Sequence, residues 1–183
     1  MYSIVVISAG ISRPSSTTRV AHRLSSAVSN AMNARGAQTS ITTIELRDLA
    51  VDLAHALVSK EFSPALTAAY RELEAAAALI AVSPTFSASY SSLFKMFFDV
   101  MDKDLLTDKP VLLGATAGTQ RHSLMLEHAM RPLFSFLRAR IVPTAVFVTT
   151  QDCAEEEARE IETRIGRGAR QLAREIISEP DNL

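Results

Sequence analysis

Five short apolar runs, separated by longer segments with helical spacing, form the main hydrophobic pattern of the chain. They cover residues 4–7, 40–46, 79–82, 111–115 and 144–149. Two of them, IVVI and LIAV, show no alternation of apolar and polar residues, which is typical of strands buried on both faces of a parallel sheet. Strands that alternate with helices predict βαβ units. The pattern therefore predicts an α/β protein with a five-stranded parallel sheet.

Helical segments connect these runs and follow the last of them. The Ser-Pro pair at residues 63–64 is typical of a helix N-cap and first turn, and Asp152 with Glu155 forms the pattern of a capping box. Gly166 and Gly168 interrupt the last helix, at a cost of about 1 kcal/mol each relative to Ala. By analogy with other sheets of this kind, we expect a flavodoxin-like three-layer sandwich with strand order 2-1-3-4-5.

Composition and charge narrow the function classes. With 48% hydrophobic content, residues 1–183 are long enough for one well-buried core, so we expect a single domain. The 20 acidic and 19 basic residues give a net charge of −1, which indicates no surface for nucleic acid or an anionic membrane. No apolar run approaches the roughly 18 residues that span a bilayer, and we expect a cytoplasmic protein. Cys153 is the only cysteine, which excludes an intrachain disulfide.

The segment after the first apolar run is rich in hydroxyl groups. Residues 8–19, SAGISRPSSTTR, contain five Ser and Thr residues between positions 12 and 18, just before the first predicted helix. Amides and the dipole at a helix N-terminus favour an anion. Because neither GxGxxG nor GxxxxGK[ST] is present, a monophosphate fits better than a pyrophosphate, and Arg13 could add charge. The alternative is that the Ser/Thr cluster only caps the helix.

Two further loops are expected after the third and fourth runs. Residues 83–90, SPTFSASY, combine hydroxyls and amides with the flat faces of Phe86 and Tyr90. Residues 114–122, GATAGTQRH, contain small residues that let a backbone lie against a ring edge. Ligands of open α/β sheets bind at the carboxyl ends of the strands. We therefore expect a phosphate at the first loop and a flat heterocycle between the other two.

Other chemistries are disfavoured by what these loops lack. A phospho-receiver domain needs an acidic cluster after the first strand, where this chain has Ser8, Ala9 and Gly10. The four histidines show no metal-ligand spacing, and no GxSxG elbow or Cys-His pair indicates acyl transfer. We therefore assign no metal ligand and no catalytic acid or base.

Two helical segments are apolar around more of their circumference than one buried stripe requires. In residues 92–101 the apolar arc reaches roughly 200°, and residues 124–137 are similarly apolar, with Pro132 expected to bend them. Because the additional apolar face needs a partner, we predict a homodimer or homotetramer in which these helices pack against their symmetry mates. The alternative is that both helices are deeply buried.

Three longer stretches carry a resemblance to a known family. They are SAGISRPSSTTR, SPTFSASYSSLFKMFFDVMD and GATAGTQRHSLMLEHAMRPLF. Together they resemble the NAD(P)H-dependent FMN reductase family, most closely the branch partnered with luciferase-like monooxygenases, from the first strand to about Asp152. One departure is Ala117, which replaces the first of two glycines in the family pattern. The resemblance implies hydride transfer from nicotinamide C4 to flavin N5, for which the protein orients two rings and needs no side-chain acid or base.

The resemblance also implies roles for residues in the three loops. The residues implied to hold the FMN phosphate are Ser8, Ser16 and Thr17, with Arg13 assisting. The residues implied to line the isoalloxazine and ribityl chain are Pro84, Thr85, Phe86 and Ser87. The residues implied at the other ring edge are Thr116, Ala117, Gly118 and Thr119.

Three functions remain open. In the first, which we favour, FMN is a dissociable substrate and reduced FMN passes to a flavin-dependent monooxygenase. In the second, FMN is held tightly and electrons pass to quinones, azo dyes or similar acceptors. The third is a flavodoxin-like electron carrier, against which the lack of an acidic excess argues. The sequence indicates no preference between NADPH and NADH.

Overall fold

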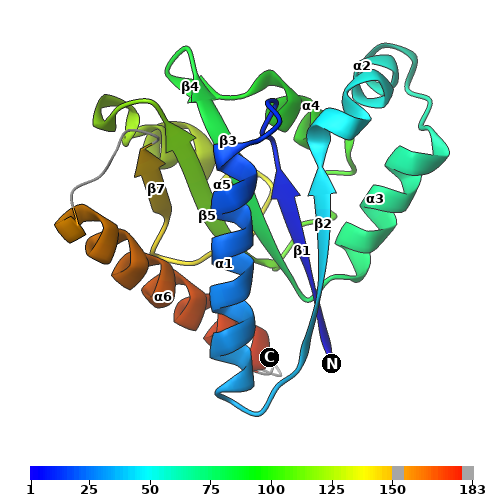
Figure 1. Ribbon diagram of the computed structural model, residues 1–183. Helices are drawn as coiled ribbons and strands as arrows, with labels where there is room; N and C mark the ends of the chain where they lie inside the picture. Colours follow the sequence, from blue (N-terminus) through cyan, green and yellow to red (C-terminus); the bar gives the residue numbers. More distant parts are fainter. Residues whose placement is uncertain (150–154, 179–183) are drawn as a thin grey trace.

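A twisted parallel sheet forms the centre of the molecule (Figure 1). The computed structural model describes residues 1–149 and 155–178. The strands of this sheet are β1 (Tyr2–Ser8), β2 (Thr39–Glu45), β3 (Ala78–Phe86), β5 (Pro110–Ala117), β6 (Arg140–Ile141) and β7 (Val146–Thr149). Their order is β2-β1-β3-β5-β6, and β7 also pairs with β5. This confirms the flavodoxin-like order 2-1-3-4-5, with the fifth strand in two pieces.

Helices cover both faces of the sheet. The helices on one face are α1 (Ser16–Asn33) and α6 (Glu155–Ile177). The helical segments on the other face are η1 (Leu46–Leu49), α2 (Ala50–Ser59), α3 (Pro64–Ala75), α4 (Ser92–Val100), the π-helical turn η3 (Leu126–Met130) and α5 (Arg131–Phe136). A short 3₁₀ turn, η2 (Gln120–His122), follows β5. Among the described residues, no helix combines the length and apolar composition needed to cross a membrane.

The unbroken apolar runs are explained by burial on both sides. In β1, Ile4 and Val6 pack with α1 and α6, whereas Val5 and Ile7 pack with the helices of the opposite face. All four side chains are fully buried. Since neither face of β1 meets water, polar residues have no position to occupy in the run.

The segment after the third run is a strand and a hairpin, where a loop was expected. β3 continues to Phe86 and pairs antiparallel with β4 (Ser89–Tyr90). The two turn residues, Ser87 and Ala88, have φ angles of 48° and 66°, as a two-residue hairpin turn with two positive φ angles requires. The expected loop residues therefore belong to a projecting β-ribbon at the end of the sheet.

The fifth strand also differs from its predicted bounds of 144–149. β6 was not predicted, and β7 begins only at Val146. Pro143 has no N–H to donate, and the Thr144 amide donates to Gln171 Oε1 of α6 at 2.8 Å. Because these backbone positions do not join the sheet ladder, the strand is interrupted between β6 and β7.

The predicted start of the helix at Ser63 is confirmed, whereas residues 124–137 contain two short helical elements. Ser63 is the N-cap of α3, and its Oγ accepts a hydrogen bond from the Leu66 amide at 3.1 Å, as expected. Within residues 124–137, Leu126–Met130 form the π-helical turn and Arg131–Phe136 form α5, with Pro132 in the first turn of α5. The predicted capping box at Asp152 lies outside the described residues.

Candidate functional site

A cleft of about 400 Å³ opens at the carboxyl ends of β1, β3 and β5. Its lining residues are Ile11, Ser12, Ser15, Ser16, Thr17, Pro84, Thr85, Phe86, Thr116, Ala117 and Gly118. The cleft therefore brings together the three segments that the sequence indicated separately. It lies where open α/β sheets place their ligands.

The first segment enters the cleft at the start of α1. Ser15 is the N-cap, and its Oγ accepts a hydrogen bond from the Thr18 amide at 3.1 Å. A Cβ atom at Gly10 would lie 2.0 Å from Ser15 Oγ, so only glycine permits this approach. α1 therefore begins at Ser16, directly in the cleft wall, with the positive end of its dipole beside the cavity.

The second and third segments lie next to each other on β3 and β5. Pro84 and Thr116 are register partners, and Thr116 Oγ1 is hydrogen-bonded to Thr17 Oγ1 at 2.8 Å. One buried pair of hydroxyls thus ties α1 to the end of β5. Phe86 is 48% exposed and gives the rim a flat apolar face.

Two hydroxyl groups near the cleft are buried without a hydrogen-bond partner. Thr85 Oγ1 belongs to a cleft-lining residue, and Thr119 Oγ1 lies just after the end of β5. An unpaired buried hydroxyl costs about 1–3 kcal/mol. Because both oxygens are also shielded from solvent, neither faces the open cleft directly.

Four of the predicted site residues do not line the cleft. Ser8 is fully buried and hydrogen-bonded to Thr18 Oγ1 at 3.0 Å, while Arg13 forms an exposed ion pair with Asp48. Ser87 lies at the exposed hairpin turn, and Thr119 follows Gly118 outside the lining.

Three lining residues, Ile11, Ser12 and Ser15, were not among the predicted site residues. All three lie in residues 8–19, the hydroxyl-rich segment that was expected to bind an anion. The signal that could have found Ser15 is its position after Pro14 and three residues before Thr18, as expected for an N-cap.

Side-chain charge is absent from the cleft wall. Within the described part of the chain, the lining residues include no Asp, Glu, His, Lys, Arg or Cys. The wall can therefore bind through amides, hydroxyls and apolar faces, but its lining residues offer no acid or base that could transfer a proton or activate a hydroxyl as a nucleophile. The chemistry of such a site belongs to the molecule that it binds.

Residues 2–153 match the family model described as NADPH-dependent FMN reductase. The chain belongs to this family. It is 36% identical over 151 residues to the FMN reductase (NADPH) of Pseudomonas aeruginosa, which covers 82% of this chain and 78% of the relative. It is 38% identical over 152 residues to the NADH-dependent FMN reductase SfnF of Pseudomonas fluorescens, with coverages of 83% and 79%. The prediction of an NAD(P)H-dependent FMN reductase is confirmed.

A solved structure of an oxidoreductase from Corynebacterium diphtheriae is similar over nearly the whole chain. It is 46% identical, with a TM-score of 0.95, and the match covers 98% of this chain and 99% of that one. The chain therefore shares its fold with that oxidoreductase over nearly its whole length. FMN and NAD(P)H are the substrates of an FMN reductase of this family.

Proposed function

We propose that the cleft at the carboxyl ends of β1, β3 and β5 is the flavin site. The phosphate would lie against the first turn of α1, beside Ser16 and Thr17, and the ring system between Phe86 of β3 and residues 116–118 of β5. The observation that carries this proposal is the convergence of the α1 N-terminus and the ends of β3 and β5 on one cleft at the carboxyl ends of the strands. The open space around Gly118 also leaves room for a ring edge.

The residues around the cleft then have binding and orienting roles. The bound flavin would supply the hydride-acceptor chemistry. The α1 amides and the Ser16 hydroxyl would donate hydrogen bonds to the phosphate oxygens. The Thr17–Thr116 hydrogen bond fixes α1 relative to β5, and so fixes the distance between the phosphate end and the ring end of the cleft. Ser8, Arg13, Ser87 and Thr119 would act from outside the wall.

We further propose that FMN is a dissociable substrate whose reduced form leaves for a flavin-dependent monooxygenase in the cytoplasm. The cleft wall holds no lysine or arginine in the part of the chain that the structure describes. Neutral amides and hydroxyls bind a phosphate without the ion pair or the bidentate contact that a lysine or arginine would add. A phosphate bound only by neutral groups therefore favours release of the flavin.

An assay of nicotinamide absorbance at 340 nm distinguishes the alternatives. Flavin-free protein is mixed with NADPH or NADH and titrated with FMN. Oxidation that saturates with added FMN supports the dissociable substrate. Flavin retained through gel filtration, with turnover only after a quinone or azo acceptor is added, would support the tightly bound form. An absence of oxidation with either nicotinamide would contradict the reductase activity.

Ser16→Glu tests where the phosphate binds. Ser16 is partly exposed in the cleft wall, so the substitution adds negative charge at the phosphate position without filling the core. We expect FMN affinity to fall at least tenfold, a loss of about 1.4 kcal/mol or more, as measured by quenching of flavin fluorescence. Ser26→Glu, exposed on the same helix outside the cleft, is the control. Equal FMN affinities for the two variants would remove the phosphate assignment.

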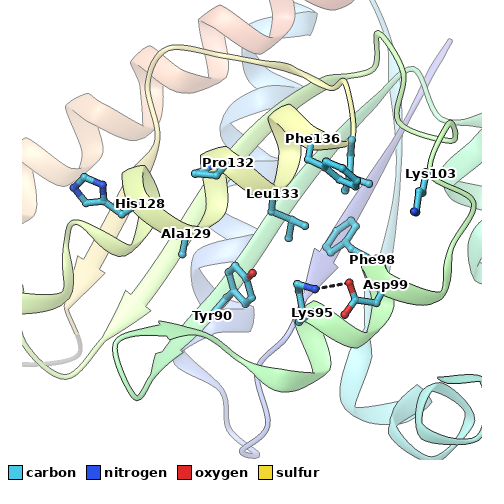
Figure 2. Close-up of a pocket in the computed structure, with 11 residues that line it drawn as sticks. Tyr90, Lys95, Phe98, Asp99, Lys103, His128, Ala129, Pro132, Leu133 and Phe136 are labelled. Carbon is cyan, nitrogen blue, oxygen red and sulfur yellow. Dashed lines mark hydrogen bonds and ion pairs between the residues drawn. The ribbon is translucent and has the colours of Figure 1, made fainter. Parts of the chain in front are cut away.

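We also propose that a second copy of the chain covers a groove between α4 and α5. The groove has a volume of about 460 Å³. Figure 2 shows Tyr90 and Phe98 on one side facing Leu133 and Phe136 on the other. Phe136 is 67% exposed, which is unusual for an aromatic side chain beside an apolar groove.

Charges at the edge of this groove favour a copy of the same chain as the partner. The wall contains both Lys103 and the ion pair of Lys95 with Asp99, whose N–O distance is 2.5 Å. A two-fold interface brings the same surface of both subunits together, so residues of both signs can meet opposite charges of the symmetry mate. This supports the predicted homodimer or homotetramer.

A further inference from the structure

An arginine at the end of β2 contacts the first loop from outside the cleft. Arg47 lies in η1, and its Nη1 donates to the Ser12 carbonyl oxygen at 2.5 Å. Its Nη2 lies 3.0 Å from Glu45 Oε2, and both side chains of this ion pair are only 18% exposed. The Arg47–Glu45 pair is therefore more shielded from water than the exposed pair of Arg13 with Asp48 nearby. Exposed ion pairs contribute little to stability, so the shielded pair is the stronger restraint on the loop.

The same carboxylate reaches the first turn of α1. Glu45 Oε2 accepts a hydrogen bond from Thr18 Oγ1 at 3.2 Å, and Thr18 Oγ1 is 3.0 Å from Ser8 Oγ. Arg47 and Glu45 thus connect the end of β2 to the Ser12 carbonyl and to the α1 N-terminus at once. The loop between these two points is the segment that carries Ser12 and Ser15 into the cleft wall.

Arg47 is not placed to bind a ligand in the cleft itself. It is not a lining residue. Its terminal nitrogens contact the Ser12 carbonyl and the Glu45 carboxylate, and its Nε atom is buried without a hydrogen-bond partner. The Glu45 carboxylate also offsets its charge, so it adds little attraction for an anion. Any effect of Arg47 on binding must pass through the loop that it holds.

The geometry points to Arg47 as a positioning residue that makes the cleft select the phosphorylated flavin over riboflavin. An anion-binding loop directs its amides toward the anion, and its carbonyl oxygens must be engaged elsewhere. Arg47 engages the Ser12 carbonyl, and through Glu45 it fixes the helix turn whose amides face the phosphate. This inference rests on the proposed flavin site.

Binding of FMN and riboflavin by the same variants tests this role, because riboflavin lacks the phosphate. We expect Arg47→Met to weaken FMN binding about tenfold, the loss typical of one hydrogen bond to a charged group, and to leave riboflavin affinity within about twofold. Both are measured by quenching of flavin fluorescence on flavin-free protein. Arg47→Lys retains a cation for Glu45 and should show a smaller selective loss. It also keeps the test available if Arg47→Met does not fold.

A second substitution separates geometry from charge. Arg47→Met leaves the Glu45 carboxylate unpaired near the phosphate position, and its repulsion alone could weaken FMN binding. The double variant Arg47→Met/Glu45→Gln removes that charge, and we expect the selective loss of FMN affinity to persist. Full recovery of FMN affinity in the double variant would overturn the positioning role in favour of simple repulsion. Arg138→Met removes an exposed ion pair with Asp104 outside the cleft and should change neither affinity.

The remaining outcomes are also decisive. An equal loss of FMN and riboflavin affinity in Arg47→Met would mean that Arg47 only stabilises the fold, and unchanged affinities would mean that it has no role in binding. Either result overturns the inference and leaves the phosphate site intact. If the unaltered protein binds riboflavin as tightly as FMN, the proposed phosphate site itself fails.

Discussion

The Tyr70 side chain becomes partly buried when the chain folds. Its hydroxyl donates to the Phe97 carbonyl oxygen at 2.7 Å, and its ring lies 4.8 Å from that of Phe97 and 5.8 Å from that of Phe62. Burial raises the pKa of Tyr70 above its usual value of 10.0. In the unfolded chain the phenol ionises near pH 10, whereas the folded form resists ionisation. The stability that Tyr70 contributes is therefore complete below pH 10 and is lost as pH rises from there toward the folded-state pKa.

Tyr70→Phe should reduce the loss of folding stability that occurs above pH 10. At pH 8 the variant should be less stable than the unaltered protein by about 1 kcal/mol, because the Phe97 carbonyl loses its hydrogen bond. At pH 11 the difference should shrink or reverse, since the variant has no phenol to ionise. Urea unfolding at the two pH values measures both differences. A constant difference across this range would show that Tyr70 ionisation is not coupled to folding.

Residue type was easier to predict than side-chain direction. The count of hydroxyls between Ser12 and Thr18 indicated an anion site, and the cleft is lined by that segment. The pattern could not show that Ser15 is the cap, or that Ser8 turns inward to Thr18, since both depend on the residue at which α1 begins. No local sequence pattern indicated a role for Arg47, because its contact with Ser12 joins residues 35 positions apart.

At the scale of elements, the least predictable segment was the β3–β4 hairpin. A loop was expected over residues 83–90, but β3 continues through Pro84, which pairs with Thr116 of β5. The Ser91 amide donates to Ser83 Oγ at 3.0 Å and helps to fix the return strand. Ser87 and Ala88 adopt positive φ angles without being glycine. Such pairing is decided by neighbouring strands and by long-range hydrogen bonds, so local turn propensity does not reveal it.

The two glycines of α6 differ in what surrounds them, which the sequence does not show. A Cβ atom at Gly168 would lie 2.9 Å from Leu112 Cδ1 of β5, and Leu112 is fully buried. At Gly166 the nearest atom would be the mobile end of Arg170, at 3.2 Å. Gly168 is therefore needed for close packing of α6 on the sheet, whereas Gly166 only weakens the helix.

Alanine substitutions should separate these two glycines. We expect Gly166→Ala to raise the free energy of unfolding by about 0.5–1 kcal/mol, the gain in helix propensity. Gly168→Ala has the same gain but overpacks against Leu112, at a cost of about 1–3 kcal/mol, so its net effect should be destabilising. Urea unfolding of the two variants measures both changes. Equal stabilisation by both substitutions would contradict the close packing of α6 on β5.

At the scale of the whole molecule, the alternation of strands and helices was sufficient to predict the sheet. The strand order came from analogy and agrees with the observed order, because right-handed crossovers leave few arrangements for five parallel strands. The described helices all pack on one face or the other of this sheet. This supports our proposal that residues 1–183 form a single domain.

The sequence predicted only in part which apolar helix faces of the molecule are left uncovered by the chain itself. The excess apolar arc of α4 was expected to pack against a symmetry mate, but Phe94, Phe97 and Phe98 are buried within the chain. In the second of the two segments, residues 124–137, Leu124 and Phe136 are exposed, and Leu133 packs partly against the core. The alternative of deep burial therefore explains much of α4, whereas α5 retains an apolar face that a partner would cover.

Phe136→Glu tests whether a second copy covers the α4/α5 groove. In an isologous interface each subunit would place one carboxylate opposite apolar groups of its mate, so a single substitution adds two buried charges per dimer. We expect sedimentation at micromolar concentration to give a dimer or tetramer for the unaltered protein and a smaller species for Phe136→Glu. Val58→Glu, on α2 and 85% exposed outside the groove, should leave the assembly unchanged. Because Phe136 is already 67% exposed, the fold should persist in the variant, and thermal unfolding checks this. A monomeric unaltered protein, or a Phe136→Glu variant that assembles as before, would show that no copy of the chain occupies this groove.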